Sequence, residues 1–158
     1  MEDLPTLLRE TRERLAAVPR ARLGEVRGPG RIRRLFGGRP VIAPADKVWH
    51  LGVLLVGEAD VWATGTVLRA EREVIRGYSA ESQRERAVIR GMAFRGGFAT
   101  GETFHVEWSP IDVERITSGG SSGPVTWDGE RLMLRWSPAG FLTPLADYLD
   151  ERIRLAQG

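Results

Sequence analysis

Leucine residues recur at helical spacing close to the N-terminus of the chain. Leu4, Leu8 and Leu15 fall on one face of a helix, and charged side chains fill the other face. Asp3 suits the start of this helix, and Pro19 ends it. Two later stretches show the same one-sided pattern. Together these patterns predict three helices, which span residues 3–18, 80–95 and 143–156.

Two runs rich in Val, Leu, Trp and Thr predict the strands of an antiparallel hairpin. They span residues 47–56 and 61–69, and the polar segment 57–60 separates them as a four-residue loop. A second hairpin is predicted at Asp128-Gly129, because this dipeptide supplies the positive φ angles of a tight turn. Both hairpins favour a sheet built from antiparallel neighbours.

The remaining strand patterns are shorter. Residues 103–108 alternate in polarity, which predicts a half-buried strand with Phe104 and Val106 on its inner face. Residues 111–116 predict a weak strand, and the Ser- and Gly-rich residues 117–124 predict a loop. We therefore expect an α+β fold in which an antiparallel sheet of about five to seven strands packs against three helices, N-terminal, central and C-terminal.

Length and composition are consistent with a single α+β domain over residues 1–158. The chain has 158 residues, of which 42% are hydrophobic, and it contains no cysteine and two histidines. The lack of cysteine excludes disulfides, thiolate metal sites and cysteine nucleophiles. Within the domain, residues 1–19 form a helical segment, and residues 20–40 form an Arg/Gly-rich extended segment with strands expected at 23–26 and 32–36.

Positive charge is concentrated in one part of the sequence. The net charge is only +2, but residues 20–39 hold seven arginines against one glutamate. Such a segment attracts anions, although its arginines could equally pair with the acidic C-terminal part, residues 96–158, or face solvent. If the segment binds an anion, the candidate residues are Arg20, Arg22, Arg27, Arg31, Arg33, Arg34 and Arg39.

Candidate catalytic chemistry is sparse. His105 and Glu107 lie two apart on a predicted strand, so they share a face and could act as an acid/base pair, with Asp112 as a further carboxylate. The simpler interpretation is that both occupy the solvent face of that strand. His50 lies in the most apolar strand, where a core histidine bonded to the backbone is expected.

Two further patterns favour structure over function. Residues 119–123 match the Gly-x-Ser-x-Gly form of a hydrolase nucleophile, but a hairpin strand follows them and both histidines precede them, so a loop is expected. The five tryptophans all fall in predicted strands, where we expect them to pack in the core or at its rim. Stacking of single-stranded nucleic acid on exposed rings is the alternative.

Three stretches carry a resemblance to known proteins. They are Val48-Trp49-His50-Leu51-Gly52-Val53-Leu54-Leu55, then Ala63-Thr64-Gly65, and finally Arg76-Gly77-Tyr78-Ser79-Ala80-Glu81-Ser82-Gln83-Arg84. In these stretches the chain resembles short uncharacterised proteins of high-GC Gram-positive bacteria, some of which are loosely named glutaminase. The resemblance implies a glutaminase, but it does not identify a catalytic residue. The residues oppose it, because Pro44 stands three positions before Lys47, the only lysine, and the chain therefore lacks Ser-x-x-Lys as well as a cysteine.

The sequence thus favours a non-enzymatic binding or adaptor module. The alternatives are a small hydrolase or transferase that uses the His105/Glu107 pair, and a nucleic-acid-binding domain that uses the Arg-rich residues 20–39. We expect no cofactor and no metal. The expected partner is an acidic protein, a nucleic acid or a second copy of the chain in a homodimer. No stretch has the length of a membrane span or the pattern of a signal peptide, which predicts a cytoplasmic protein without a membrane partner.

Overall fold

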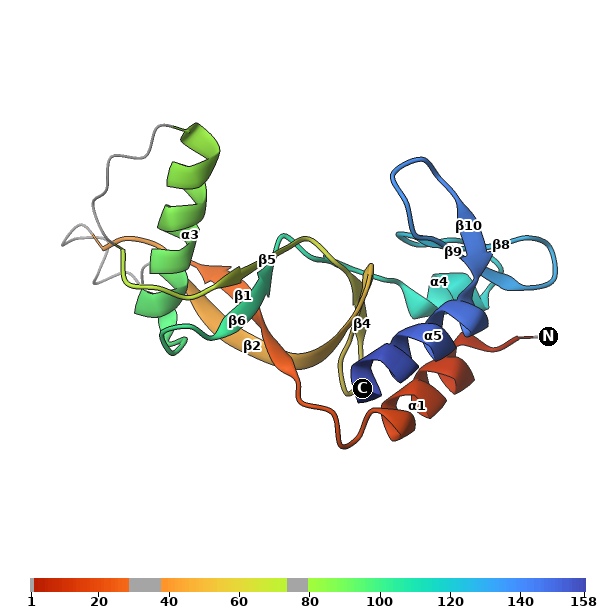
Figure 1. The fold of residues 1–158 in the computed structure, drawn as a ribbon. Coiled ribbons are helices and arrows are strands. Elements are labelled where there is room, and N and C mark those ends of the chain that lie inside the picture. The colour runs from red at the N-terminus through yellow and green to blue at the C-terminus, as the bar shows by residue number, and fades with distance from the viewer. Residues whose placement is uncertain (1, 29–37, 74–79) are drawn as a thin grey trace. The chain divides into compact units, whose positions relative to one another are not determined.

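The computed structural model describes residues 2–28, 38–73 and 80–158, and the fold is α+β (Figure 1). Over these residues it contains four helices, α1 (Leu4–Arg14), α3 (Glu81–Gly96), α4 (Val113–Thr117) and α5 (Leu145–Gln157). The strands of the same residues are β1 (Ala21–Arg27), β2 (Val41–Leu51), β3 (Leu54–Val56), β4 (Val61–Ala63), β5 (Thr66–Arg69), β6 (Thr103–Val106), β7 (Ser109–Pro110), β8 (Val125–Trp127), β9 (Leu132–Arg135) and β10 (Leu142–Pro144).

The strands form a mixed seven-stranded sheet of order β5-β6-β1-β2-β3-β4-β7 and a three-stranded sheet of order β10-β9-β8. The expectation of a purely antiparallel sheet is wrong, because β1 and β6 pair in parallel, with Arg22 opposite Phe104. Parallel neighbours need a long connection, and α3 lies in the long chain segment that joins these two strands. The hairpin patterns in the sequence predict only the pairing of strands that a short loop joins, so they could not predict the pairing of β1 with β6.

The chain divides into two compact units. Unit 1 comprises Met1–Arg20, Val48–Gly65 and Glu107–Gly158, and unit 2 comprises Ala21–Lys47 and Thr66–Val106. Each unit has its own hydrophobic core. The two are described separately below.

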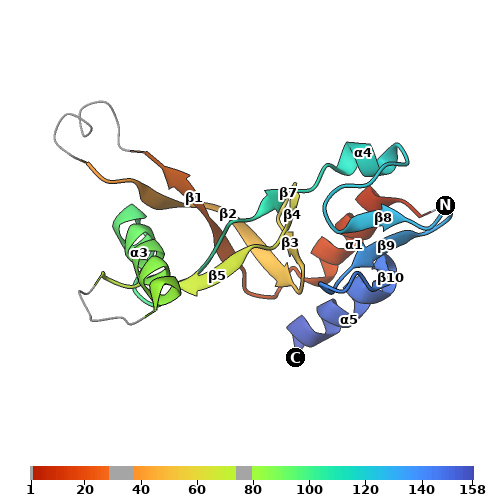
Figure 2. The ribbon, with the colours of Figure 1, turned by 90° about the horizontal axis from the view of Figure 1, so that it is seen from above.

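In unit 2, helix α3 packs against strands β5, β6 and β2 (Figures 1 and 2). Phe104 of β6 is fully buried and contacts the ring of Phe98 at a centroid distance of 5.2 Å. Ala93 of α3 belongs to the same core, with Ile89 and Met92 packed against its edge. These helix residues lie three to four positions apart, which is the spacing of one helical face.

Helix α3 confirms the predicted central helix, including its glycine end. Gly97 adopts a φ of +117°, the left-handed conformation that ends many helices. Val88 is 45% exposed, because the buried face of α3 runs through Ala93. Gly91 is also buried and permits a close approach of the chain after β5.

In unit 1, the predicted hairpin around residues 57–60 is confirmed. Val56 of β3 pairs with Val61 of β4 in antiparallel register. The predicted strand 47–56 is interrupted, however, because Gly52 adopts a φ of +63° and turns the chain so that Leu51 pairs with Leu54. The glycine also leaves room for the hydroxyl of Tyr148, which would overlap a Cβ at this position.

The second hairpin of unit 1 is confirmed as the pair β8 and β9, with Trp127 opposite Leu132. Its turn is wider than a two-residue turn, and of the predicted dipeptide only Gly129 has a positive φ, of 110°. Asp128 closes the turn by accepting hydrogen bonds from the backbone N–H groups of Glu130 and Arg131. These bonds lower the pKa of the Asp128 carboxyl, because they stabilise its charged form.

Helices α1, α4 and α5 complete unit 1, with α1 beside α5 (Figures 1 and 2). The predicted strand 111–116 is wrong: Asp112 accepts a hydrogen bond from the N–H of Arg115 and starts α4. Helix α5 begins one residue after Pro144, and Thr143 and Pro144 pair with β9 as part of β10. Within the described residues, no helix is long and apolar enough to cross a membrane.

Candidate functional site: an arginine-lined pocket

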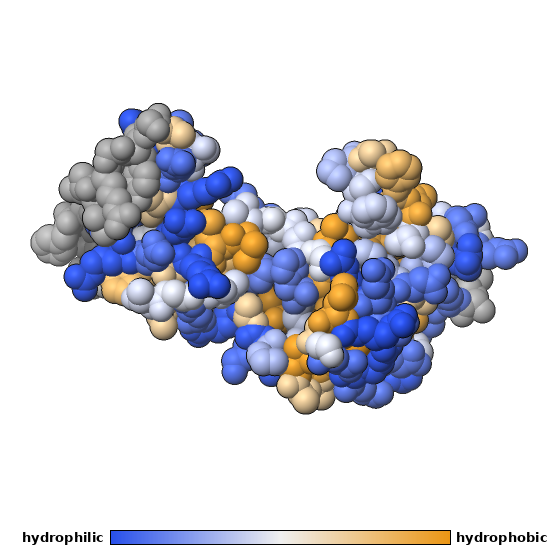
Figure 3. All heavy atoms as spheres, in the orientation of Figure 1, coloured by the Kyte–Doolittle hydropathy of each residue, from blue (hydrophilic) through white to orange (hydrophobic). Residues whose placement is uncertain are grey.

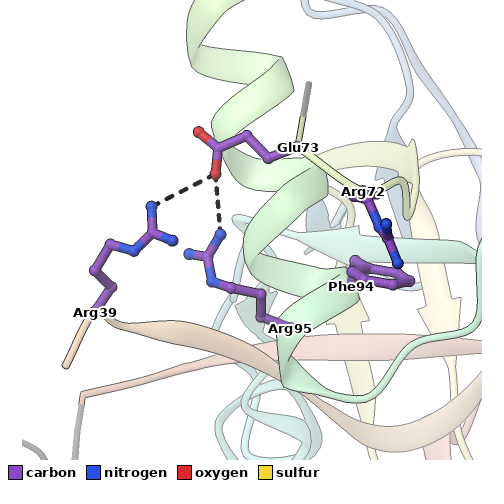
Figure 4. Close-up of a pocket in the computed structure, with 5 residues that line it drawn as sticks. All are labelled: Arg39, Arg72, Glu73, Phe94 and Arg95. Atoms are coloured by element: carbon purple, nitrogen blue, oxygen red, sulfur yellow. Dashed lines mark hydrogen bonds and ion pairs between the residues drawn. The ribbon is translucent and has the colours of Figure 1, made fainter. Parts of the chain in front are cut away.

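A cavity of about 380 Å³ opens in unit 2 (Figure 4). It is lined by Arg39, Arg72, Glu73, Phe94 and Arg95. Three guanidinium groups and one carboxylate give these side chains a net charge of +2. The cavity therefore attracts anions.

Three chain segments bring these residues together. Arg39 precedes β2, Arg72 and Glu73 follow β5, and the last turn of α3 supplies the two remaining residues. The segment after β5 runs close to α3 because position 91 is glycine: a Cβ there would lie 2.8 Å from the Cβ of Glu73. The cavity thus depends on the absence of a side chain at Gly91 as well as on the side chains that line it.

Glu73 holds two of the arginines. One of its carboxylate oxygens accepts a hydrogen bond from Arg95 Nη1 at 3.0 Å and lies 3.7 Å from Arg39 Nη1 (Figure 4). Arg95 also donates to the carbonyl of Pro40 at 3.4 Å. The side chain of Arg39 is 67% exposed, so the longer of the two ion pairs is the weaker one.

Arg72 differs from the other two arginines. Its guanidinium stacks over the ring of Phe94, with 5.7 Å between the guanidinium carbon and the ring centroid (Figure 4). Among the residues that the structure describes, Arg72 forms no ion pair. Residues 29–37 and 74–79, which lie outside the description, contain no Asp or Glu in the sequence. Among the described residues, no acidic side chain pairs with Arg72.

A second cavity of unit 2, of about 350 Å³, has a more mixed lining. Arg69, Arg90 and Glu71 contribute charges there, and the Nε atom of Arg90 is buried without a hydrogen-bond partner. The side chains of Val67, Leu68 and Thr103 complete the lining. Its net charge of +1 makes it a weaker anion site than the pocket around Arg72.

The predicted arginine segment does not form one continuous strip. Arg31, Arg33 and Arg34 lie outside the described residues. Arg20 belongs to unit 1, where it stacks over Trp49 at 5.0 Å, while the other described candidates belong to unit 2. Of the candidates that the structure describes, Arg39 alone lines the pocket.

Arg22 has a structural role. Its Nε and Nη2 atoms donate to the two oxygens of Glu102 at 2.6 and 2.7 Å, and its guanidinium stacks over Phe98 at 5.0 Å. The hydrogen bonds lower the pKa of Glu102 and raise that of Arg22. Glu102 lies in the acidic C-terminal part, residues 96–158. This pair therefore agrees with the alternative in which arginines of residues 20–39 pair with that part. Arg27 instead lies 3.7 Å from Glu25, close to it in sequence.

The structure places the predicted histidine and glutamate in different environments. His105 is 2% exposed in β6, between Leu23 of β1 and Val67 of β5, so its predicted position on a solvent face is wrong. Glu107 lies beyond the end of β6, is exposed, and has a φ of 59°, which ends the alternation of the strand. Asp112 caps α4. The three residues do not share a strand face.

The other residues considered in the sequence have local roles. His50 is exposed rather than in the core, and its Nε2 lies 2.8 Å from the carbonyl oxygen of Gly52. In the loop 119–123, Ser122 Oγ accepts a hydrogen bond from the N–H of Asp112. Neither arrangement assembles a nucleophile with a base.

The tryptophans largely follow the expectation of packing. Trp49 and Trp62 are buried, and the indole N–H of Trp49 donates to the carbonyl of Val18. Trp136 is the exception: it is 46% exposed and stacks on Phe141 at the tip of the β9–β10 hairpin, where apolar atoms reach the surface (Figure 3). This tip is the exposed aromatic surface that unit 1 presents.

Four of the five pocket residues were missed by sequence reasoning. Arg72 and Glu73 are adjacent in sequence, as are Phe94 and Arg95, but no motif links the two pairs. The available signal was the excess of arginine between residues 69 and 95. Comparison of the chain with protein-family models, curated proteins and solved structures finds no match.

Proposed function

We propose that the protein is a non-enzymatic binding module that holds an anionic ligand in the arginine-lined pocket of unit 2. The observation that carries this proposal is the convergence of three guanidinium groups on a cavity that contains a single carboxylate. Arginine offers several N–H donors in a fixed plane, which suits carboxylate and phosphate ligands. The pocket volume of about 380 Å³ falls in the range of small-molecule sites.

The enzymatic alternative has less support. His105 is 2% exposed, so a substrate could reach its imidazole only if the residues that cover it moved aside. In the pocket itself, the carboxylate of Glu73 already engages two arginines. The resemblance to proteins named glutaminase adds no residue to either site.

The nucleic-acid alternative rests on exposed basic residues of unit 2. Arg27 and Arg39 have side chains that are 60% and 67% exposed. Arg22, by contrast, is occupied by Glu102 and Phe98, which reduces the predicted strip. A pocket supports a small anion better than an extended strand, so nucleic acid is an outcome of the test below.

The test uses the full chain, with citrate and inorganic phosphate as probes in titration calorimetry at low salt. We expect at least one of these anions to bind. Arg39→Gln should weaken binding, and its exposed position should leave the thermal midpoint close to that of the parent. Arg86→Gln, on the exposed surface of α3, is the control with the same charge change. If no anion binds, or if both variants weaken binding equally, the proposal is wrong.

A further inference from the structure

Resting on the proposed function, we infer the chemical class of the ligand: a phosphate monoester dianion, bound along the edge of the Arg72 guanidinium. The inference starts from a comparison within unit 2. Two arginines there stack on phenylalanine rings, Arg22 on Phe98 and Arg72 on Phe94. Only the first of them also meets a carboxylate.

The Arg22 arrangement shows how such a pair is completed. The ring attracts the positive charge of the guanidinium, while the N–H donors of the group remain able to bind an acceptor. Glu102 occupies two of those donors at 2.6 and 2.7 Å. Arg22 therefore has both a ring and an anion as neighbours.

The Arg72 arrangement has the ring without the anion. The Arg72 guanidinium lies over the ring of Phe94, and no acid of the described residues pairs with it. The side chain also lines an open cavity (Figure 4). An anion with two acceptor oxygens in one plane would complete at Arg72 the contact that Glu102 makes at Arg22.

The charge of the pocket indicates a dianion. Glu73 compensates one of the three positive charges, which leaves a net charge of +2. A phosphate monoester carries a charge of about −1.5 to −2 at pH 7, whereas a sulfonate or a phosphodiester carries −1. A terminal phosphate thus matches the pocket better than the backbone of a nucleic acid does.

Two further arginines lie within the same lining to contact such a group. Arg39 and Arg95 already converge on one oxygen of Glu73, which shows that they can share an anionic oxygen. The cavity of about 380 Å³ exceeds the volume of a phosphate alone. The ring of Phe94 supplies an apolar wall for the group to which the phosphate is attached.

The test compares two ligands of similar shape and different charge, phenyl phosphate and benzenesulfonate, by titration calorimetry of the full chain. We expect phenyl phosphate to bind about tenfold more tightly at pH 7.5, because it carries a second negative charge. The preference should shrink at pH 5, where most of the phosphate is a monoanion. If phenyl phosphate and benzenesulfonate bind with equal affinity at pH 7.5 and at pH 5, the phosphate assignment is wrong. The protein would then remain an anion-binding module, as the proposed function states.

Variants test the role of Arg72. Arg72→Gln should weaken phenyl phosphate binding about tenfold or more, and Arg72→Lys should restore only part of it, since lysine keeps the charge but loses the planar edge. Arg86→Gln is the matched control. Unchanged binding in a folded Arg72→Gln variant, checked by its thermal midpoint, would overturn the assignment to Arg72.

A final arm separates a terminal phosphate from a nucleic-acid backbone. A single-stranded oligonucleotide is measured with and without a 5′-phosphate. Tighter binding of the phosphorylated strand supports the inference. If both strands bind equally, and both are weakened by Arg72→Gln, Arg72 recognises the nucleic-acid backbone and the inference is wrong. If neither the small ligands nor the strands bind, the proposed function fails together with the inference.

Discussion

A guanidinium group offers neighbours two different surfaces, a flat face and a hydrogen-bonding edge. In unit 2, the Arg22 guanidinium lies over a ring and also donates to a carboxylate, whereas that of Arg72 lies over a ring and pairs with no acid of the described residues. The same residue type therefore has a structural role at one position and is available to a ligand at another. The difference depends on a single acid, Glu102, which Arg22 has and Arg72 lacks.

Glu102→Gln tests the structural role of the Arg22 pair. Because the pKa of Glu102 is lowered in the folded protein, its carboxylate stabilises the fold above the usual glutamate pKa of about 4.3, and that contribution is lost as the pH falls through the lowered value. At pH 7 the variant should be less stable by about 1 kcal/mol. Below about pH 4 the difference should shrink toward zero.

Chemical denaturation at several pH values measures this dependence. Glu25→Gln serves as the control, since Glu25 and Arg27 form a longer, exposed pair at 3.7 Å. Its effect should stay within about 0.5 kcal/mol at neutral pH. A stability difference for Glu102→Gln that is the same at pH 3 and pH 7 would contradict the role assigned to its charge.

At the scale of elements, glycines on α3 control how closely it approaches its neighbours. A Cβ at Gly96 would overlap the backbone carbonyl of Ile42 in β2. Backbone atoms cannot rotate away as a side-chain end can, so the helix itself would have to shift. Phe94 and Arg95 occupy the same turn and would move with it.

We therefore predict that Gly96→Ala destabilises the protein by about 1–3 kcal/mol and also weakens anion binding. Ser82→Ala, an exposed substitution near the start of α3, should change neither property appreciably. Thermal unfolding and calorimetric titration of both variants test this. A Gly96→Ala variant with unchanged stability would show that α3 and β2 are not in the close contact described here.

Elements with a strong local signal could be predicted from the sequence. The helix patterns located α1, α3 and α5, and the Gly57–Asp60 loop located the β3–β4 hairpin. Helix α4 was mistaken for a strand, because five residues hold too little periodicity to show a helix and the Asp112 cap was overlooked. The parallel pairing of β1 with β6 joins residues far apart in sequence, which no local pattern reports.

The candidate site was less predictable than the fold. His105 occupies a strand flanked on both sides and is buried, so the alternation of polar and apolar residues gave it the wrong environment. The pocket depends on Arg72 and Phe94, which come together only because Gly91 lets the chain after β5 pass close to α3. The sequence alone specifies the residue types but not this approach.

At the scale of the whole molecule, charge is unevenly divided. The described residues of unit 2 hold ten basic and seven acidic side chains, and those of unit 1 hold nine basic and fourteen acidic ones. The net charge of +2 for the full chain therefore conceals an acidic unit and a basic one. Anion binding should therefore depend on the position of each charged side chain, and not on the net charge of the chain.

Three substitutions that each lower the net charge by one test this point. Arg72→Gln changes the pocket, Arg86→Gln changes the exposed surface of α3, and Arg135→Gln changes an exposed position of β9 in unit 1. We expect the affinity for phenyl phosphate to fall strongly in the first, slightly in the second and not at all in the third. The reason is that Arg72 lines the pocket and the other two do not, while salt screens exposed charges that do not contact the ligand.

The salt dependence of the same titrations provides an independent measurement. Between about 0.02 and 0.2 M sodium chloride the parent should lose about fivefold in affinity, since screening weakens the attraction between the pocket and a dianion. Arg135→Gln should follow the parent curve, while Arg72→Gln should show a flatter one because fewer charges then contribute. Equal losses of affinity in all three variants would show that the net charge governs binding, and the pocket would no longer be the site.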